Sequence, residues 1–268
     1  TSSNKRYFST MFRSIVLFSL LGVIAAHPLQ TFEQHLSPDQ AKRLEEWTED
    51  DSENIWELSG QFEGDILLRR DPRTGILDET LRWWNNEIPY ELDSDYTFEE
   101  REKIVTALAQ YEATNVRVRP RTPSDVDYVY VNRNATGCSS FIGRVGNVQV
   151  LNLAPGCLRA GTIVHEFLHA FGFYHQQSAT NRDDYVTIVW DNIAPDHAFN
   201  FDKYDSSVIG EFGGTYDYGS VMHYSEKAFS INGESTIIPH DSSAVIGQRV
   251  GLSEIDIKRL NQMYPKLQ

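Results

Sequence analysis

The chain has 268 residues, which is enough for one sizeable domain together with segments that are removed during processing. Its 38 acidic residues outnumber 24 basic ones, so the formal net charge is -14 at pH 7. A charge of this sign repels phosphate backbones and argues against nucleic acid as a partner. It is compatible with an extracellular enzyme but selects no substrate.

The first element, residues 11–26, has the layout of a secretory signal peptide. It starts with a methionine, Arg13 makes it weakly basic, residues 15–24 form an apolar run, and Ala25-Ala26 supplies small residues for cleavage. The alternative is a buried or membrane-anchoring helix. No later apolar run is long enough to span a bilayer, so we expect no membrane association and a soluble mature protein.

The next stretch, residues 27–73, is polar and acidic. It carries Glu49-Asp50-Asp51, has room for a short helix around Pro38–Trp47, and ends in the basic cluster Arg69–Arg73. In a secreted chain this order predicts a pro-segment with a trypsin-like cleavage point. The alternative on composition alone is a solvated acidic linker.

From Thr74 onward the composition is that of a globular domain. Residues 82–90 read as a strand preceded by a turn, and we expect the tryptophans Trp83 and Trp84 to lie in the core. Thr97 followed by a glutamate three residues later is a capping box, and apolar residues then recur at helical spacing to about Thr114.

Short strands are expected at residues 116–118, 128–131, 148–153 and 185–190, and a helix at Ser253–Tyr264. Regular structure looks sparse between the last strand and this helix.

Two features fit a secreted protein. Asn134-Ala135-Thr136 is an N-glycosylation acceptor, although an unused sequon is the alternative. Cys138 and Cys157 flank the strand at 148–153, so one disulfide would close a hairpin-like region. Two free buried thiols are the alternative, and a cysteine metal ligand is disfavoured because histidines already supply one ligand set.

That ligand set lies in the stretch from His165 to His175. His165 and His169 are four residues apart, so a helix places both imidazoles on one face, within reach of one Zn²⁺. Glu166 can serve as the general base for a zinc-bound water. Gly172 can end the helix and turn the chain, so that His175 returns as a third ligand and leaves a position open for water. A buried amphipathic helix with hydrogen-bonded histidines is the alternative.

This stretch, together with Ser220–Tyr224 downstream and Phe62–Asp65 upstream, resembles the astacin family of secreted zinc endopeptidases, which are metzincins. The resemblance covers the chain from about Phe62 to Tyr264. It implies an α+β fold of two subdomains with a substrate cleft between them. The upper one has a mixed sheet with a backing helix and the zinc helix above the cleft. The lower one is largely irregular and ends in a helix.

The resemblance makes His165, His169 and His175 the zinc ligands and Glu166 the general base. It places Met222 in a tight turn under the metal, as a packing residue. It makes Tyr224 a switching residue that coordinates zinc at rest and hydrogen-bonds the reacting carbonyl. It also assigns residues 148–153 as the edge strand that holds the substrate main chain by strand addition.

Upstream, Asp65 matches the aspartate switch of the family, in which a pro-segment carboxylate replaces the catalytic water on zinc. Gly64 would allow the close approach. Thr74 aligns with the mature N-terminus, so cleavage after Arg73 would give the active form. The implied boundaries are residues 11–26 for the signal peptide, 27–73 for the pro-segment and 74–268 for the catalytic domain.

Two departures from the family pattern matter. The residue after the third histidine is usually a glutamate that pairs with the new N-terminal ammonium, and here it is Gln176. A second disulfide, from the region of residues 116–118 to the chain end, is also missing, which leaves the C-terminal helix held by packing alone.

The sequence therefore predicts a secreted, extracellular and monomeric zinc metalloendopeptidase with one Zn²⁺ per chain. It would be made as a zymogen, be activated by a trypsin-like protease, and act on protein or peptide substrates. Two rivals are an inactive zinc-containing binding protein and a zinc hydrolase of non-peptide substrates. An intact Glu166 and Tyr224 argue against the first, and the strand-addition edge and the pro-segment argue weakly against the second.

Overall fold

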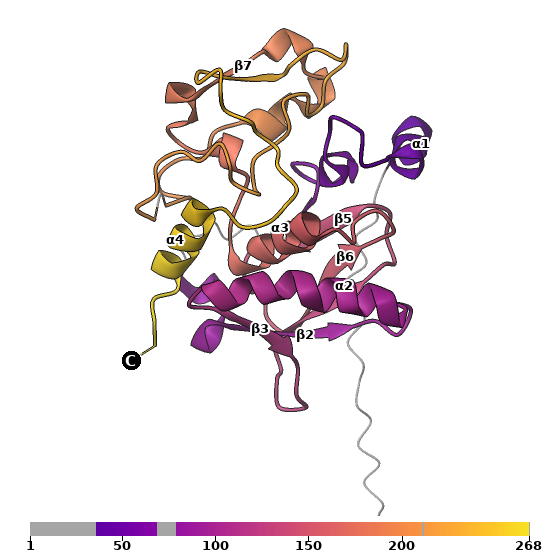
Figure 1. The fold of residues 1–268 in the computed structure, drawn as a ribbon, viewed down its shortest axis with the longest axis vertical. Coiled ribbons are helices and arrows are strands. Elements are labelled where there is room, and N and C mark those ends of the chain that lie inside the picture. Colours follow the sequence, from indigo (N-terminus) through magenta and orange to yellow (C-terminus); the bar gives the residue numbers. More distant parts are fainter. Residues whose placement is uncertain (1–35, 69–78, 211, 268) are drawn as a thin grey trace, which may run out of the picture.

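This computed structural model describes residues 36–68, 79–210 and 212–267 (Figure 1). The expected signal peptide at residues 11–26 and the expected cleavage site between Arg73 and Thr74 lie outside the described residues.

A six-stranded mixed sheet forms the larger part of the molecule, with strand order β1-β5-β6-β4-β2-β3. All neighbouring strands are parallel except the antiparallel pair β5 and β6. The strands are β1 (Ile66–Leu67), β2 (Glu87–Leu92), β3 (Arg117–Pro120), β4 (Tyr128–Asn132), β5 (Cys138–Phe141) and β6 (Val148–Leu153).

Two helices, α2 (Phe98–Leu108) and α3 (Ala160–Phe171), lie side by side against the sheet (Figure 1). Thr97 and Glu100 form the expected capping box at the start of α2, a feature that typically contributes about 1 kcal/mol. The hydroxyl of Tyr111, just after α2, donates to the carbonyl of Val164 in α3 at 2.8 Å, which ties the two helices together inside the core.

The pairing of β6 differs from the prediction. We expected residues 148–153 to be the edge strand, but β6 is paired on both sides, by β4 and by β5. The chain reverses direction between β4 and β5 and again between β5 and β6, so β5 lies outside β6 in a hairpin whose open ends the disulfide joins. The outer side of β5 is covered by β1, through Ile66 opposite Ser140.

The second part of the molecule, residues 176–252, is largely irregular, as predicted. Its only sheet among the described residues pairs β7 (Val186–Ile188) with β8 (Ile237–Pro239), and its own core mixes aromatic and aliphatic side chains. The rest is turns and short 3-10 segments. Over the whole described chain the 3-10 segments are Ile55–Leu58, Glu79–Leu81, Trp84–Asn86, Ala109–Ala113, Gln176–Ser178, Arg182–Asp184, Trp190–Asn192 and Pro195–Phe201.

Residues 36–68, here called the N-terminal segment, lie between the two parts. The segment opens with the helix α1 (Pro38–Glu46), capped by Ser37, and continues through a 3-10 turn at Ile55–Leu58 to β1 (Figure 1). Ile66 joins the sheet, whereas the main-chain N–H of Glu63 donates to the side chain of Asn200 in the irregular part at 3.1 Å.

The C-terminal helix α4 (Glu254–Met263) is not held by packing alone, which corrects our expectation. Asp256, at its first turn, is buried and accepts hydrogen bonds from the hydroxyl of Ser220 at 2.6 Å and the N–H of Val221 at 3.0 Å. Helix α4 is therefore tied directly to the turn that contains Met222.

A second set of hydrogen bonds lies near the position where the resemblance described above implies a second disulfide. The N–H of Asn115 donates to the side-chain oxygen of Asn261 at 2.5 Å, and the side-chain amide of Asn86 donates to the carbonyl of Pro265 at 2.8 Å. We call these two contacts the asparagine clasp. It replaces a covalent link by neutral hydrogen bonds, each worth about 0.5–1.5 kcal/mol.

Of the two tryptophans expected in the core, only Trp83 is buried; its indole N–H donates to the carbonyl of Ala170 at 2.7 Å. Trp84 is 65% exposed, and the guanidinium of Arg144 stacks over its ring at 4.1 Å from the centroid. Trp83 is extended, whereas Trp84 opens the 3-10 segment Trp84–Asn86, so the backbone changes conformation between the two residues.

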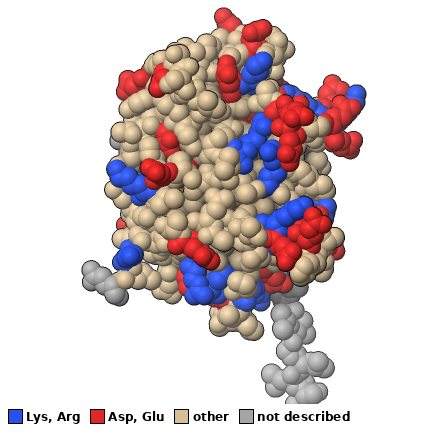
Figure 2. All heavy atoms as spheres, viewed as in Figure 1, with Lys and Arg blue, Asp and Glu red and all other residues tan. Residues whose placement is uncertain are grey.

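Acidic and basic side chains lie next to one another over much of the face seen in Figure 2, so the excess of acid does not form one continuous patch in this view. Among the described residues, none of the helices is both long and apolar enough to cross a membrane.

Candidate metal centre

Helix α3 places the first two histidines. His165 and His169 are one turn apart, and almost the whole helix is buried between the sheet and the irregular part. The helix ends at Gly172, which has φ +114° and whose N–H bonds to the carbonyls of Leu168 and His169. This left-handed turn, predicted from the sequence, sends the chain back so that His175 faces the other two imidazoles.

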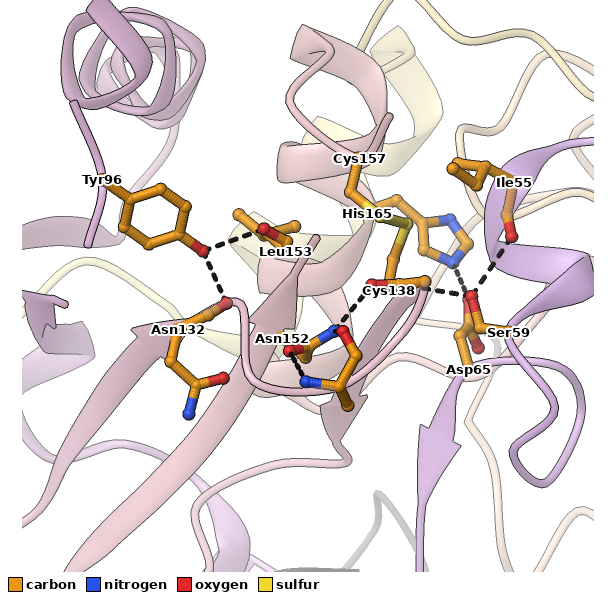
Figure 3. The surroundings of a disulfide bond; sticks show 12 residues. Ile55, Ser59, Asp65, Tyr96, Asn132, Cys138, Asn152, Leu153, Cys157 and His165 are labelled. Atoms are coloured by element: carbon orange, nitrogen blue, oxygen red, sulfur yellow. Dashed lines mark hydrogen bonds and ion pairs between the residues drawn. A yellow bond between two sulfur atoms is a disulfide. The ribbon is translucent and has the colours of Figure 1, made fainter. Parts of the chain in front are cut away.

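Four buried side chains meet at one point. Nitrogens of His165, His169 and His175 and a carboxylate oxygen of Asp65 all lie within 4.8 Å of one another. The carboxylate of Asp65 is 2.9 Å from Nε2 of His165, and its other oxygen is 3.3 Å from Nε2 of both His169 and His175. Figure 3 shows Asp65 and His165 pointing toward each other beside the disulfide.

The opposite nitrogen of each imidazole has its own partner. Nδ1 of His165 lies 2.9 Å from the carbonyl of Val221, and Nδ1 of His169 lies 2.6 Å from the carbonyl of Phe173. Nδ1 of His175 lies 2.9 Å from the carboxylate of Glu63. An acceptor at Nδ1 favours a proton on that nitrogen, so Nε2 of each ring is the atom that can face a metal at the shared point.

Burial and neighbouring charges shift the pKa values of several of these groups. Burial lowers the pKa of His165 to about 4, so this ring is neutral at physiological pH. Burial first and the negative charge of Asp65 second raise the pKa of Glu166 well above its usual value. Burial alone would raise the pKa of Asp65, but the neighbouring His175 and His169 lower it well below its usual value.

The residues present fit a zinc ion. Nε2 of His169, Nε2 of His175 and Oδ1 of Asp65 are buried and have no hydrogen-bond partner among the described residues. Unsatisfied buried polar atoms are costly, and a cation shared by them would remove that cost. Three imidazole nitrogens and one carboxylate oxygen are a four-ligand set that zinc accepts.

The other predicted site residues lie around this centre. Both carboxylate oxygens of Glu166 are buried without a hydrogen-bond partner among the described residues, as expected of a group kept for a reacting molecule. Met222 is buried, and its carbonyl accepts from the N–H of Gln176 at 2.9 Å. The ring of Tyr224 lies 4.7 Å from that of His175, and its hydroxyl donates to the carbonyl of Glu63 at 2.7 Å.

The N-terminal segment makes contacts that sequence reasoning missed. The indole of Trp56 stacks on His165 with 4.2 Å between ring centroids. The buried carboxylate of Glu57 accepts from the N–H and the hydroxyl of Ser225, each at 2.6 Å. Asn54 and Glu57 also form a capping box, a local pattern that could have revealed an ordered turn within this acidic stretch.

The two cysteines form the predicted disulfide, Cys138–Cys157, with 5.8 Å between their Cα atoms. Ser59 of the N-terminal segment accepts a hydrogen bond from the N–H of Cys138 at 2.8 Å and donates to the carbonyl of Ile55 at 3.1 Å (Figure 3). The disulfide therefore braces the strand against which the N-terminal segment lies.

Two further residues stay apart from the metal centre. The side-chain oxygen of Gln176 accepts a hydrogen bond from the guanidinium of Arg259 in α4, which also donates to the carbonyl of Thr215 at 2.8 Å. Asn134 is exposed in the loop between β4 and β5, and its glycosylation stays a prediction.

Comparison with known proteins gives consistent matches. Residues 76–265 match the family model described as Astacin, which is a family of peptidases. The zinc metalloproteinase nas-14 of Caenorhabditis elegans is 47% identical over 185 residues, which are 68% of this chain and 37% of that protein. Meprin A subunit beta of Rattus norvegicus is 41% identical over 207 residues, which are 76% of this chain and 29% of that protein.

A solved structure agrees with the fold. High choriolytic enzyme 1, a hatching enzyme zinc-protease from Oryzias latipes, superposes with a TM-score of 0.64 at 38% identity and covers 69% of this chain and 94% of its own. By contrast, this chain spans well under half the length of nas-14 and of the meprin subunit.

Proposed function

Since the chain belongs to the astacin family of peptidases, we propose that it is a secreted zinc metalloendopeptidase made in an inactive form. The observation that carries the proposal is the buried meeting point of His165, His169, His175 and Asp65, with the unpaired carboxylate of Glu166 beside it. Its substrates are proteins or peptides, and its activity depends on one zinc per chain.

In this proposal His165, His169 and His175 hold the metal in the active form. Zinc, when bound, supplies Lewis-acid polarisation of the scissile carbonyl. Glu166 takes a proton from the attacking water and later delivers it to the leaving amine. Because Glu166 is fully buried while the N-terminal segment is in place, base catalysis requires that segment to leave.

Tyr224 supplies a hydrogen bond to the oxygen that gains negative charge as the carbonyl is attacked. Its hydroxyl is occupied by the carbonyl of Glu63 in the present arrangement, so the N-terminal segment withholds this donor as well. Met222 has no chemical role; in its turn, the carbonyl of Val221 bonds to Nδ1 of His165 and the carbonyl of Met222 accepts from the N–H of Gln176, directly after His175.

The N-terminal segment acts as the pro-segment. Asp65 occupies the position that substrate and water need, and β1 covers the outer side of β5. With β1 gone, β5 is the strand edge open to a substrate main chain. We propose that a trypsin-like protease cuts after Arg73, that the active chain starts at Thr74, and that it works as a monomer outside the cell.

The test uses the full chain and the form that begins at Thr74. The latter should cleave a denatured protein, and a zinc chelator should abolish cleavage. His169→Ala should lose both zinc and activity, whereas His240→Ala should keep both, because the imidazole of His240 lies on the surface and bonds to Thr187 and to the carbonyl of Asp184. Full zinc occupancy in the His169→Ala protein would contradict the assignment.

A further inference from the structure

Glu63 is the most constrained residue of the N-terminal segment. It is 2% exposed and has φ +49°, a left-handed conformation that is strained for a residue with a side chain. Its N–H donates to Asn200, and its carbonyl accepts from Tyr224. Its carboxylate lies 2.9 Å from Nδ1 of His175 and also accepts from the hydroxyl of Tyr204.

The three histidines differ in which part of the chain supplies the hydrogen-bond partner of Nδ1. The Nδ1 partners of His165 and His169 are the carbonyls of Val221 and Phe173, which belong to the catalytic part of the chain. The Nδ1 partner of His175 is Glu63, which belongs to the N-terminal segment. Cleavage therefore leaves two of these bonds in place and removes the third.

His175 is also the ligand that most needs such a partner. His165 and His169 are fixed by helix α3, whereas His175 follows Gly172 and has an extended backbone, with φ -68° and ψ 145°. A carboxylate at Nδ1 fixes the tautomer and orientation of an imidazole and increases the basicity of the nitrogen that faces the metal. Loss of such a partner typically costs about 10–100-fold in metal affinity.

We propose that Glu63 is a positioning residue for zinc, which orients His175 through Nδ1 so that the uncut chain holds the metal more tightly than the cut chain. The inference rests on the proposed zinc site and gives the N-terminal segment a second role. The segment blocks the metal centre with Asp65 and also supplies, through Glu63, the hydrogen-bond partner that orients His175. Glu63 and Asp65 together also bring two negative charges that match a divalent cation.

The test measures zinc release from the uncut full chain into excess chromogenic chelator, with mass spectrometry to show that the chain stays uncut. Glu63→Ala should release zinc about 10–100-fold faster than the wild type. Glu63→Gln, which keeps an acceptor but not the charge, should fall between them. Bound Co²⁺ should show a shifted visible spectrum in both variants, because the geometry at His175 changes.

Glu57→Gln is the matched control. Glu57 is a buried carboxylate of the same segment, but it docks on Ser225 and contacts no histidine. This variant should loosen the segment yet keep the wild-type rate of release and the wild-type Co²⁺ spectrum. If Glu57→Gln released zinc as fast as Glu63→Ala, the metal would be retained by the attachment of the whole N-terminal segment and not by Glu63 in particular. This result would overturn the inference.

The outcomes separate this inference from the proposed function. If the uncut wild type binds no zinc, both fall. If it binds zinc but all three variants release it at the wild-type rate, the zinc peptidase assignment stands and the role of Glu63 is refuted.

Discussion

Replacing Tyr224 by phenylalanine tests the proposed chemistry most directly, because it removes one oxygen and keeps the ring. The ring is fully buried, with its centroid 4.7 Å from His175, 5.7 Å from Phe201 and 5.5 Å from Phe229. These contacts survive the substitution, so the fold and the zinc content of the Tyr224→Phe enzyme should match the wild type.

The expected losses differ between the two forms of the chain. In the uncut chain the substitution removes one hydrogen bond to the carbonyl of Glu63, so the free energy of unfolding should fall by about 0.5–1.5 kcal/mol. In the active form it removes a donor that acts on the transition state, so kcat should fall by about 10²–10³-fold with KM little changed. The larger effect corresponds to about 3–4 kcal/mol of transition-state stabilisation.

Steady-state kinetics on one fluorogenic peptide, with zinc measured in parallel, provides the assay. Tyr216→Phe is the matched control, because it also removes a buried hydroxyl, one that bonds to His223 at 2.7 Å. A Tyr224→Phe enzyme with unchanged kcat, or one that fails mainly through KM, would reduce Tyr224 to a packing residue. So would an equal loss in Tyr216→Phe.

Three further predictions follow from the same contacts. Asp65→Ala should give the uncut chain measurable peptidase activity or faster self-processing, and a variant as inert as the wild type would place the block elsewhere in the N-terminal segment. Because Arg259 already donates to Gln176, active forms extended by one or two residues before Thr74 should keep most of their activity in a peptide assay. A large loss of activity would show that activity depends on the exact N-terminal residue. Burial lowers the pKa of His223 to about 4, below its usual 6.5, so unfolding takes up a proton. Stability should therefore fall as pH drops from 6.5 toward 4, by on the order of 3 kcal/mol, and urea titrations should show a shallower fall in His223→Gln.

The metal centre could be predicted from the sequence because its determinants are local. A helix period of 3.6 residues puts His165 and His169 on one face, and only a left-handed turn at Gly172 returns the chain to the metal. These rules need no knowledge of the rest of the fold. The disulfide was predictable for a similar reason, since two cysteines allow only one pairing within the chain.

Long-range arrangements were not predictable in this way. The alternating pattern of β6 looks the same in an edge strand as in a strand paired on both sides, and the reversal of the chain between β4 and β5 decides which it is. Glu63 was visible within the Phe62–Asp65 motif, but its partners His175 and Tyr204 are more than a hundred residues away. The hydrogen bonds of Asp256 escaped notice because carboxylates at helix starts usually face solvent.

The asparagine clasp has a consequence for the heat sensitivity of the metal centre. Helix α4 packs Met263 against the turn at Gly172, and the hydroxyl of Tyr264 donates to the carbonyl of Phe171 at 2.9 Å. The chain end thus packs against the turn at Gly172, which directs His175 toward the metal centre. A disulfide would hold the chain end in place until the whole domain unfolds. The hydrogen bonds of the clasp can instead break and re-form by local unfolding, whose free energy is smaller than that of global unfolding. Metal loss on warming should therefore begin with fraying at the C-terminus, at temperatures where the sheet is still intact.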